Sequence, residues 1–102
     1  MIFDSSLLGK KVRVTCIEDE PCDIVGEVFG LDTFLQVVAV ILPVEQARKI
    51  CPFFDVDYDY RKEVFESIIN RVDVLGDTIG ELEEKDFPCI VDYRYLNLVL
   101  EK

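Results

Sequence analysis

The stretch I-V-G-E-V-F-G-L-D-T-F-L-Q-V-V, residues 24–38, constrains the fold more strongly than any other part of the sequence. It is apolar and strand-like, yet Gly26 and Gly30 interrupt it ahead of a polar turn. Glycine weakens a strand interior and usually marks a sharp bend or a close approach of two backbones. A strongly bent antiparallel sheet that closes into a small barrel needs such bends. The stretch therefore predicts a bent strand at about 23–31, a tight turn, and another strand at about 34–42.

The residues before this stretch predict one more strand. Lys11–Ile17 alternate between polar and apolar side chains, as in a strand with one buried face. The following E-D-E-P-C-D contains Pro21 among acids, a composition typical of a turn. The strand at 34–42 is almost continuously apolar, which is expected where both faces of a sheet are covered.

Residues 43–71 have a helical pattern instead. V-E-Q-A-R-K-I, at 44–50, predicts a short helix that ends before Pro52. In the following segment, apolar residues recur at a helical spacing and share one face: Val64, Phe65, Ile68, Ile69 and Val72. We expect Asp57 or Asp59 to cap this second helix. The segment thus predicts a helical insertion between the third and fourth strands.

Beyond the insertion the strand pattern returns. Residues 72–82 read as two short strands around Gly76, and residues 86–102 as a C-terminal extension. The length of 102 residues suits one domain, 1–102, with one modest core. An apolar fraction of 50% argues against disorder. The sequence therefore predicts a mainly β single domain.

The charge of the chain limits its partners. There are 21 acidic and 11 basic residues, so the formal net charge is −10. Because phosphate affinity comes mainly from Lys and Arg, this charge opposes unassisted RNA binding and favours a basic protein surface as partner. The N-terminal residues lack the pattern of a signal peptide, and no run reaches membrane-spanning length. We therefore expect an intracellular protein of the cytoplasm, the nucleus or both, with no membrane contact.

The residue types that carry catalysis are poorly represented. The sequence has no His, no Gly-rich phosphate loop followed by Lys and no nucleophile elbow. Its cysteines are spaced unlike zinc ligands, and we interpret them as reduced, partly buried small residues: Cys16, Cys22, Cys51 and Cys89. We expect a protein without catalytic activity, metal or cofactor.

One acidic segment imitates a calcium-binding loop. Asp55, Asp57, Asp59 and Glu66 fall at positions 1, 3, 5 and 12 of such a loop. Tyr60, however, stands where that loop needs Gly for a sharp turn. The acids therefore indicate a helix start, or a surface that contacts a basic partner through Asp55, Asp57 and Asp59.

Two short motifs together resemble those of the Sm and Sm-like (LSm) family. The first is carried by Gly26, Asp32, Phe34, Leu35 and Gln36. The second is carried by Val74, Leu75, Gly76, Asp77 and Ile79. The resemblance covers residues 5–42 and 72–83. It implies a small SH3-like barrel of five strongly bent antiparallel strands.

The resemblance also implies an RNA site. In the family, the two motif turns face the lumen of a ring and sandwich a uracil, which here would involve Asp32, Phe34, Gln36, Leu75, Gly76 and Asp77. Gln36 replaces the family's Asn and Leu75 its Arg, so the base-reading amide is longer and the cation is lost. No Lys or Arg lies near either turn in the sequence, only Asp32 and Asp77. We therefore interpret Phe34 as a core or interface residue, and both acids as acceptors of backbone N–H groups.

The family also pairs edge to edge, the fourth strand of one subunit joining the fifth strand of the next. Here that implies a partner-binding edge with Val72, Val74, Ile79 and Leu82. A chain with degenerate motifs is similar to the Gemin subunits of the SMN complex, which pair with Sm-fold partners and help load Sm proteins onto small nuclear RNA for splicing. Two alternatives stay open: an LSm ring subunit that binds U-rich RNA, and an acidic inhibitor or immunity protein of a basic nuclease.

Overall fold

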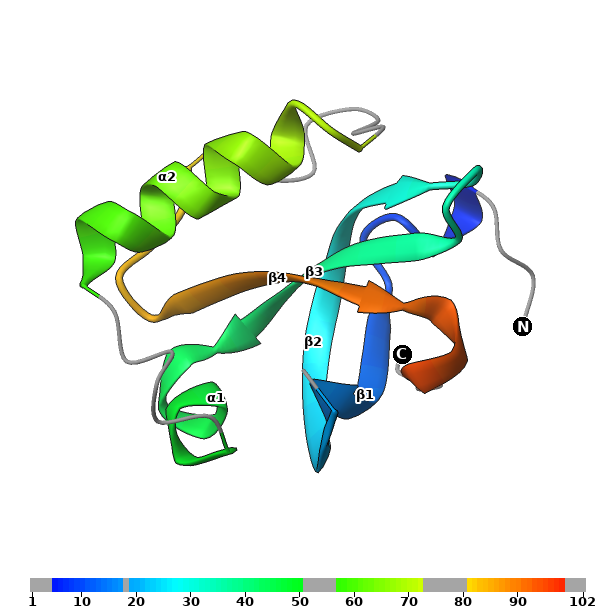
Figure 1. The fold of residues 1–102 in the computed structure, drawn as a ribbon, viewed down its shortest axis with the longest axis horizontal. Coiled ribbons are helices and arrows are strands. Elements are labelled where there is room, and N and C mark those ends of the chain that lie inside the picture. Colours follow the sequence, from blue (N-terminus) through cyan, green and yellow to red (C-terminus); the bar gives the residue numbers. More distant parts are fainter. Residues whose placement is uncertain (1–4, 18, 51–56, 73–80, 99–102) are drawn as a thin grey trace.

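The computed structural model describes residues 5–17, 19–50, 57–72 and 81–98, and shows a mainly β fold with two helices (Figure 1). The strands are β1 (Lys11–Ile17), β2 (Glu20–Asp32), β3 (Val37–Pro43), β4 (Asp86–Asp92) and β5 (Leu96–Leu98). The helices are α1 (Val44–Ile50) and α2 (Tyr58–Ile69), and short 3-10 helices span Ser5–Leu7 and Tyr93–Tyr95. The mainly β class and the helical insertion between the third and fourth strands are thus confirmed.

The strands form one antiparallel sheet in the order β4-β3-β2-β1-β5. Its two border strands, β4 and β5, do not pair with each other in the described ranges, so the sheet is open there. β5 has only three residues and follows a 3-10 turn, which leaves little backbone for a closing ladder. The predicted closed barrel is therefore not established by the pairing of the strands.

The first three strands form where the sequence predicts them, but with other bounds for two: β2 extends beyond the predicted 23–31, and β3 begins at Val37 and not at residue 34, because residues 33–36 form the turn. β1 has the predicted bounds, and its alternate residues Val12 and Val14 are fully buried. The chain reverses within residues 18–23 as predicted, but Pro21 is not part of the turn, because it lies inside β2, opposite Cys16. The chain reverses earlier, where Asp19 adopts a left-handed conformation with φ of 68°.

The bend of β2 is built from a bulge and a close contact. The register with β3 shifts between Val28 and Gly30, which marks the bulge. A Cβ on Gly26 would lie 2.7 Å from the carbonyl oxygen of Ile41 and 2.6 Å from Cδ2 of Leu42. The prediction that these glycines mark a bend and a close backbone approach is confirmed.

The C-terminal residues were predicted wrongly. Residues 86–92 form β4 and residues 96–98 form β5, so they belong to the sheet and are not an extension. Their apolar residues Phe87, Val91 and Leu96 are buried in the core. The fourth and fifth strands expected within 72–83 fall mostly on 73–80, outside the described residues, and the flanking residues 72 and 81–83 are not in strands.

The sheet has a core on each face. The main core, covered by α1 through Val44 and Ala47, contains buried residues of β1, β2, β3 and β4. The second core lies under α2, where Phe65 and Ile68 pack with Phe29 of β2. The Phe29 and Phe65 rings are 5.2 Å apart between centroids. The apolar face predicted for α2 and its Asp57 cap are confirmed, since the Asp57 side chain accepts the N–H of Tyr60 at 2.8 Å.

Candidate functional site

The turn between β2 and β3 presents the most exposed aromatic side chain in the described part of the chain. Phe34 is 91% exposed and its neighbour Leu35 is 56% exposed. Asp32 Oδ1 accepts the N–H of Phe34 at 2.9 Å and that of Leu35 at 3.0 Å. Gln36 completes the turn with a positive φ of 57°. Asp32 therefore shapes the turn as predicted. Phe34 was predicted as a core or interface residue; its exposure rules out the core, and the interface stays a prediction.

A second turn, Asp92–Tyr95, lies against this one. The N–H of Tyr93 donates to the carbonyl of Gln36 at 3.2 Å, which joins the two turns. This second turn carries Arg94, a cation that the sequence interpretation did not place near the Phe34 turn. The predicted second-motif residues lie outside the described residues: Val74, Leu75, Gly76, Asp77 and Ile79. The described neighbour of the Phe34 turn is thus an Asp-Tyr-Arg sequence from the end of β4.

Arg94 is held by Asp92. Arg94 Nε donates to Asp92 Oδ1 and Arg94 Nη2 to Asp92 Oδ2, each at 3.1 Å. The backbone N–H of Arg94 also donates to Asp92 Oδ1, at 2.9 Å. The side-chain hydrogen bonds from Arg94, and then its backbone N–H, lower the pKa of Asp92. Because the pair neutralises itself, this corner offers Phe34 no excess positive charge for a phosphate.

The outer edge of β4 is a second candidate site. In the continuous β3–β4 register, Tyr93 N–H donates to Gln36 and Val44 N–H donates to Lys85, so odd-numbered residues of β4 bond towards β3. Hydrogen bonding alternates along an antiparallel strand, so the even-numbered residues direct their backbone groups away from the sheet. These residues are Asp86, Pro88, Ile90 and Asp92. No strand in the described ranges pairs with this edge.

The Asp86 end of this edge is closed by α2. Arg61, a residue of α2 that is only 6% exposed, donates from Nε to the Asp86 carbonyl at 3.1 Å. Its Nη2 donates to the carbonyl of Glu84 at 2.6 Å. The N–H of Asp86 donates to Glu83 at 3.0 Å. Among the described residues, the edge therefore has no partner from Pro88 onward.

The structure separates the residues predicted to bind a partner. Val72 and Leu82 are 8% and 4% exposed, because both pack in the second core instead of lying at a sheet edge. The Tyr58 hydroxyl also donates to the Leu82 carbonyl. Asp57 caps α2, and Asp59 is exposed, with its carboxylate 3.8 Å from Lys62 Nζ. Asp55 lies outside the described residues.

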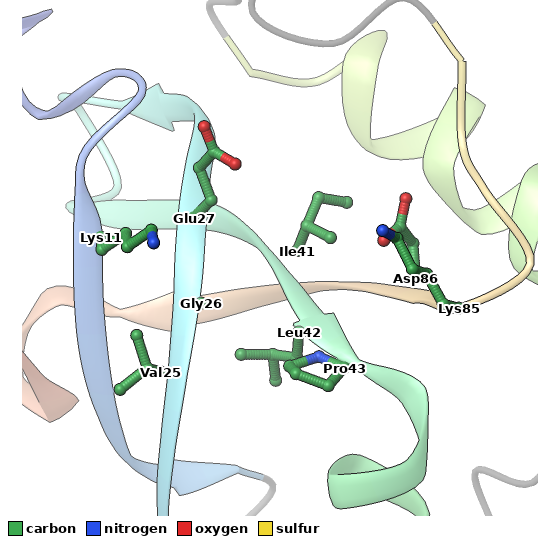
Figure 2. A pocket seen from close by; sticks show the side chains of 9 residues that line it. All are labelled: Lys11, Val25, Gly26, Glu27, Ile41, Leu42, Pro43, Lys85 and Asp86. Atoms are coloured by element: carbon green, nitrogen blue, oxygen red, sulfur yellow. The ribbon is translucent and has the colours of Figure 1, made fainter.

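A shallow depression of about 340 Å³ lies where β2 and β3 separate (Figure 2). The β2–β3 ladder starts at Glu27 and Ile41, and beyond it Leu42 and Pro43 line the depression with Gly26. Its charged residues are two lysines and two acids, Lys11, Lys85, Glu27 and Asp86, so their formal charges cancel. The depression therefore shows no charge preference for a ligand.

Other features of the described residues carry little functional information. Cys16, Cys22 and Cys89 are half-buried, as predicted, and are not joined in disulfides among the described residues, whereas Cys51 lies outside those residues. No cluster of three or more Cys, Asp or Glu side chains in the ranges that the structure describes could hold a metal ion. Neither helix of those ranges is long and apolar enough to cross a bilayer.

Comparison of the chain with protein-family models, curated proteins and solved structures finds no match in any of the three. The functional argument therefore depends on the two sites described above. Sequence reasoning missed Arg94 and the β4 edge. One signal could have found the edge: Pro88 within the strand-like F-P-C-I-V, because proline occurs in sheets mainly on border strands.

Proposed function

We propose that this chain is a non-catalytic interaction subunit that binds a protein partner by strand-edge pairing through β4. The observation that carries the proposal is the outward direction of the Ile90 and Asp92 backbone groups. A partner strand laid beside them would gain backbone hydrogen bonds, and the side chains of β4 would select its sequence. The high acidic charge favours a partner with a basic surface.

The finer proposal is an Sm-like subunit of an intracellular ribonucleoprotein-assembly complex, of the Gemin type. The strand order β4-β3-β2-β1-β5 supports it, because β4 and β5 are then the border strands, as in a small five-stranded barrel. The turn with Asp32 and Phe34 supports it as well, because these residues belong to the first motif. Under this proposal the sheet bends into an SH3-like barrel with an unpaired border at β4, and β4 pairs there with a strand of an Sm-fold protein. RNA is then contacted only indirectly.

The test uses the full chain and purified Sm proteins. We expect a stable complex by size-exclusion chromatography with mass detection, abolished by Ile90→Pro, which removes the outward N–H. Ile90→Val is the matched control, because it keeps the N–H and the β-branched side chain, and it should bind normally. Binding that is unchanged in Ile90→Pro, or assembly of the chain alone into a closed ring, would refute the proposal.

A second candidate function is direct binding of U-rich RNA. It is favoured by one observation: Phe34 is almost fully exposed, beside a turn that carries Arg94. Exposed aromatic rings and guanidinium planes are the groups on which unpaired bases stack. Against it stand the net charge of −10 and the pairing of Arg94 with Asp92.

Titration of the chain with oligo(U) at low salt separates the two functions. Direct recognition predicts binding that weakens at least about tenfold in Phe34→Ala, the loss expected for one stacked base. Tyr60→Ala is the control, since Tyr60 is an exposed aromatic residue on α2, 54% exposed. Absence of binding, or equal loss in both variants, would leave strand-edge pairing as the function.

A further inference from the structure

The open part of the β4 edge is symmetric about one residue. At one end, Arg61 already donates a hydrogen bond to the Asp86 carbonyl. At the other end, the chain leaves the strand after Asp92 and forms the 3-10 helix Tyr93–Tyr95. The outward positions that remain are Pro88, Ile90 and Asp92, with Ile90 in the middle. Proline lacks an N–H, so Pro88 offers an acceptor only. Ile90 and Asp92 each offer a donor and an acceptor.

We propose that two copies of this chain pair through β4, antiparallel, about a two-fold axis at Ile90. This inference rests on the proposed function, because it uses the same edge and names the partner as a second copy. Each Ile90 N–H donates to the Ile90 carbonyl of the other copy. Each Asp92 N–H donates to the Pro88 carbonyl opposite, whereas Pro88 has no N–H to return, so the Asp92 carbonyl receives no bond across the pair. Two-fold pairing of one surface with itself is the commonest form of protein self-association.

The side chains of β4 agree with this register. Residues directly opposite each other share a face of an antiparallel pair. Ile90 therefore meets Ile90 of the second copy on the face covered by α2, and Cys89 meets Val91 of the second copy on the face of the main core. Ile90 and Cys89 are half-buried hydrophobic residues at the borders of these two cores. Pairing would extend both cores across the axis.

Neighbouring registers are less favourable. An axis at Val91 would place each Ile90 opposite the carboxylate of Asp92. An axis at Cys89 would bring Asp92 opposite Asp86, whose carbonyl already accepts from Arg61. An axis at Pro88 would place two residues without N–H opposite each other. An axis at Val91 would also use the outward N–H groups of Ile90 and Asp92, so the side chains decide between the two registers: only the register centred on Ile90 sets Ile90 against Ile90.

Charge predicts how the dimer responds to salt. Each copy carries a formal charge of −10, so two copies repel each other. Salt screens this repulsion, since the Debye length falls from about 30 Å at 0.01 M to about 8 Å at physiological ionic strength. The dimer should therefore strengthen with added salt. A complex with a basic protein should weaken under the same change.

The first experiment measures mass by sedimentation equilibrium of the full chain at low and physiological salt. We expect twice the monomer mass of 11.8 kDa, with tighter association at the higher salt. Ile90→Pro removes both bonds at the axis and should weaken the dimer about tenfold or more. Ile90→Val keeps both bonds and should dimerise normally. A chain that stays monomeric, or a dimer unaffected by Ile90→Pro, overturns the inference.

The second experiment tests the register, and decides the matter if Ile90→Pro does not fold. Opposite residues of a hydrogen-bonded pair have Cα atoms about 5.5 Å apart, within the range that a disulfide spans. Oxidised Ile90→Cys should form a covalent dimer, and peptide mapping should place the bond between the two substituted positions. Glu20→Cys, exposed at the start of β2, is the control and should not cross-link. A dimer without the residue-90 bond overturns the register.

The two proposals fail differently. If the chain is monomeric alone but binds Sm proteins in an Ile90-dependent way, the dimer is refuted and the proposed function stands. If Ile90→Pro changes neither self-association nor binding of Sm proteins, both the dimer and strand-edge pairing through β4 are refuted.

Discussion

The two ends of β4 differ in whether their outward backbone groups are hydrogen-bonded within the chain. At the closed end, Asp86 donates to Glu83 and accepts from Arg61, so its outward groups are used within the chain. At the open end, no strand in the described ranges pairs with Ile90 and Asp92. One buried arginine on α2 thus decides where the free edge begins. Groups bonded within the chain stabilise the fold, and those left outward are available to a partner.

Replacement of Arg61, which closes the Asp86 end, should have the largest effect on the free energy of unfolding. Arg61→Leu removes the donors to the Glu84 and Asp86 carbonyls, and we expect the free energy of unfolding to fall by about 3 kcal/mol. Urea denaturation measures the change. Lys62→Leu, at the exposed neighbouring position, is the control and should change it by less than about 0.5 kcal/mol. Equal effects in the two variants would show that Arg61 does not close this end.

The close backbone approach beside the closed end should give the next largest effect. Gly26→Ala puts a Cβ within 2.7 Å of the Ile41 carbonyl oxygen, so the strands must shift, at about 2 kcal/mol. Gly9→Ala is a matched control, because a Cβ there meets nothing within 4 Å. Gly9 has a φ of +78°, so it should still cost about 1 kcal/mol through backbone strain. Thermal unfolding measures both changes. A greater loss of stability in Gly9→Ala than in Gly26→Ala would contradict the close approach of Gly26 to the Ile41 carbonyl.

In the turn beside the open end, we expect Asp32 to contribute to stability and the exposed Phe34 to contribute little. Asp32→Ala removes the acceptor of two turn N–H groups and should lower the free energy of unfolding by about 1 kcal/mol. Phe34→Ala should change it by less than about 0.5 kcal/mol, since the ring is 91% exposed. Chemical denaturation of both variants tests the contrast. A larger loss for Phe34→Ala would mean that the ring packs on the chain.

The smallest effect concerns the ion pair at the open end. The pKa of Asp92 lies below its ordinary value of 3.8 because Arg94 hydrogen-bonds the carboxylate. The ion pair therefore stabilises the fold at pH values above 3.8. This stabilisation is lost as the pH falls through the lowered pKa of the folded protein. NMR titration of the Asp92 carboxyl should show the pKa rising in Arg94→Gln. An unchanged pKa would show that Arg94 is not its partner in solution.

Local patterns predicted the first three strands and both helices well. The alternation at 11–17 and the helical spacing from Val64 to Val72 depend on neighbours within a few residues, which the sequence displays directly. Asp32 as a turn acceptor and Asp57 as a helix cap follow from the same short-range chemistry. These features were therefore predictable residue by residue.

The candidate sites depended on pairing between distant segments. The second motif was sought at 74–79 because of its residue types, whereas the turn that adjoins Phe34 in the described structure is Asp92–Tyr95. β5 pairs with β1 across more than 80 residues of chain, as in Val12 with Leu98. Local patterns contain no information on such pairs. The error over 86–102 and the omission of Arg94 have this one cause.

The sequence by itself determined the elements near the N-terminus, the helical insertion and the acidic charge, because each follows from local spacing or from composition. Only the tertiary structure decided which strand forms the border of the sheet and which of its backbone groups face outward. Hydrogen bonding in a sheet alternates from residue to residue, so a group's availability depends on the register with its neighbour. The register of β4 on β3, together with the position of Arg61, makes Ile90 the centre of the open edge.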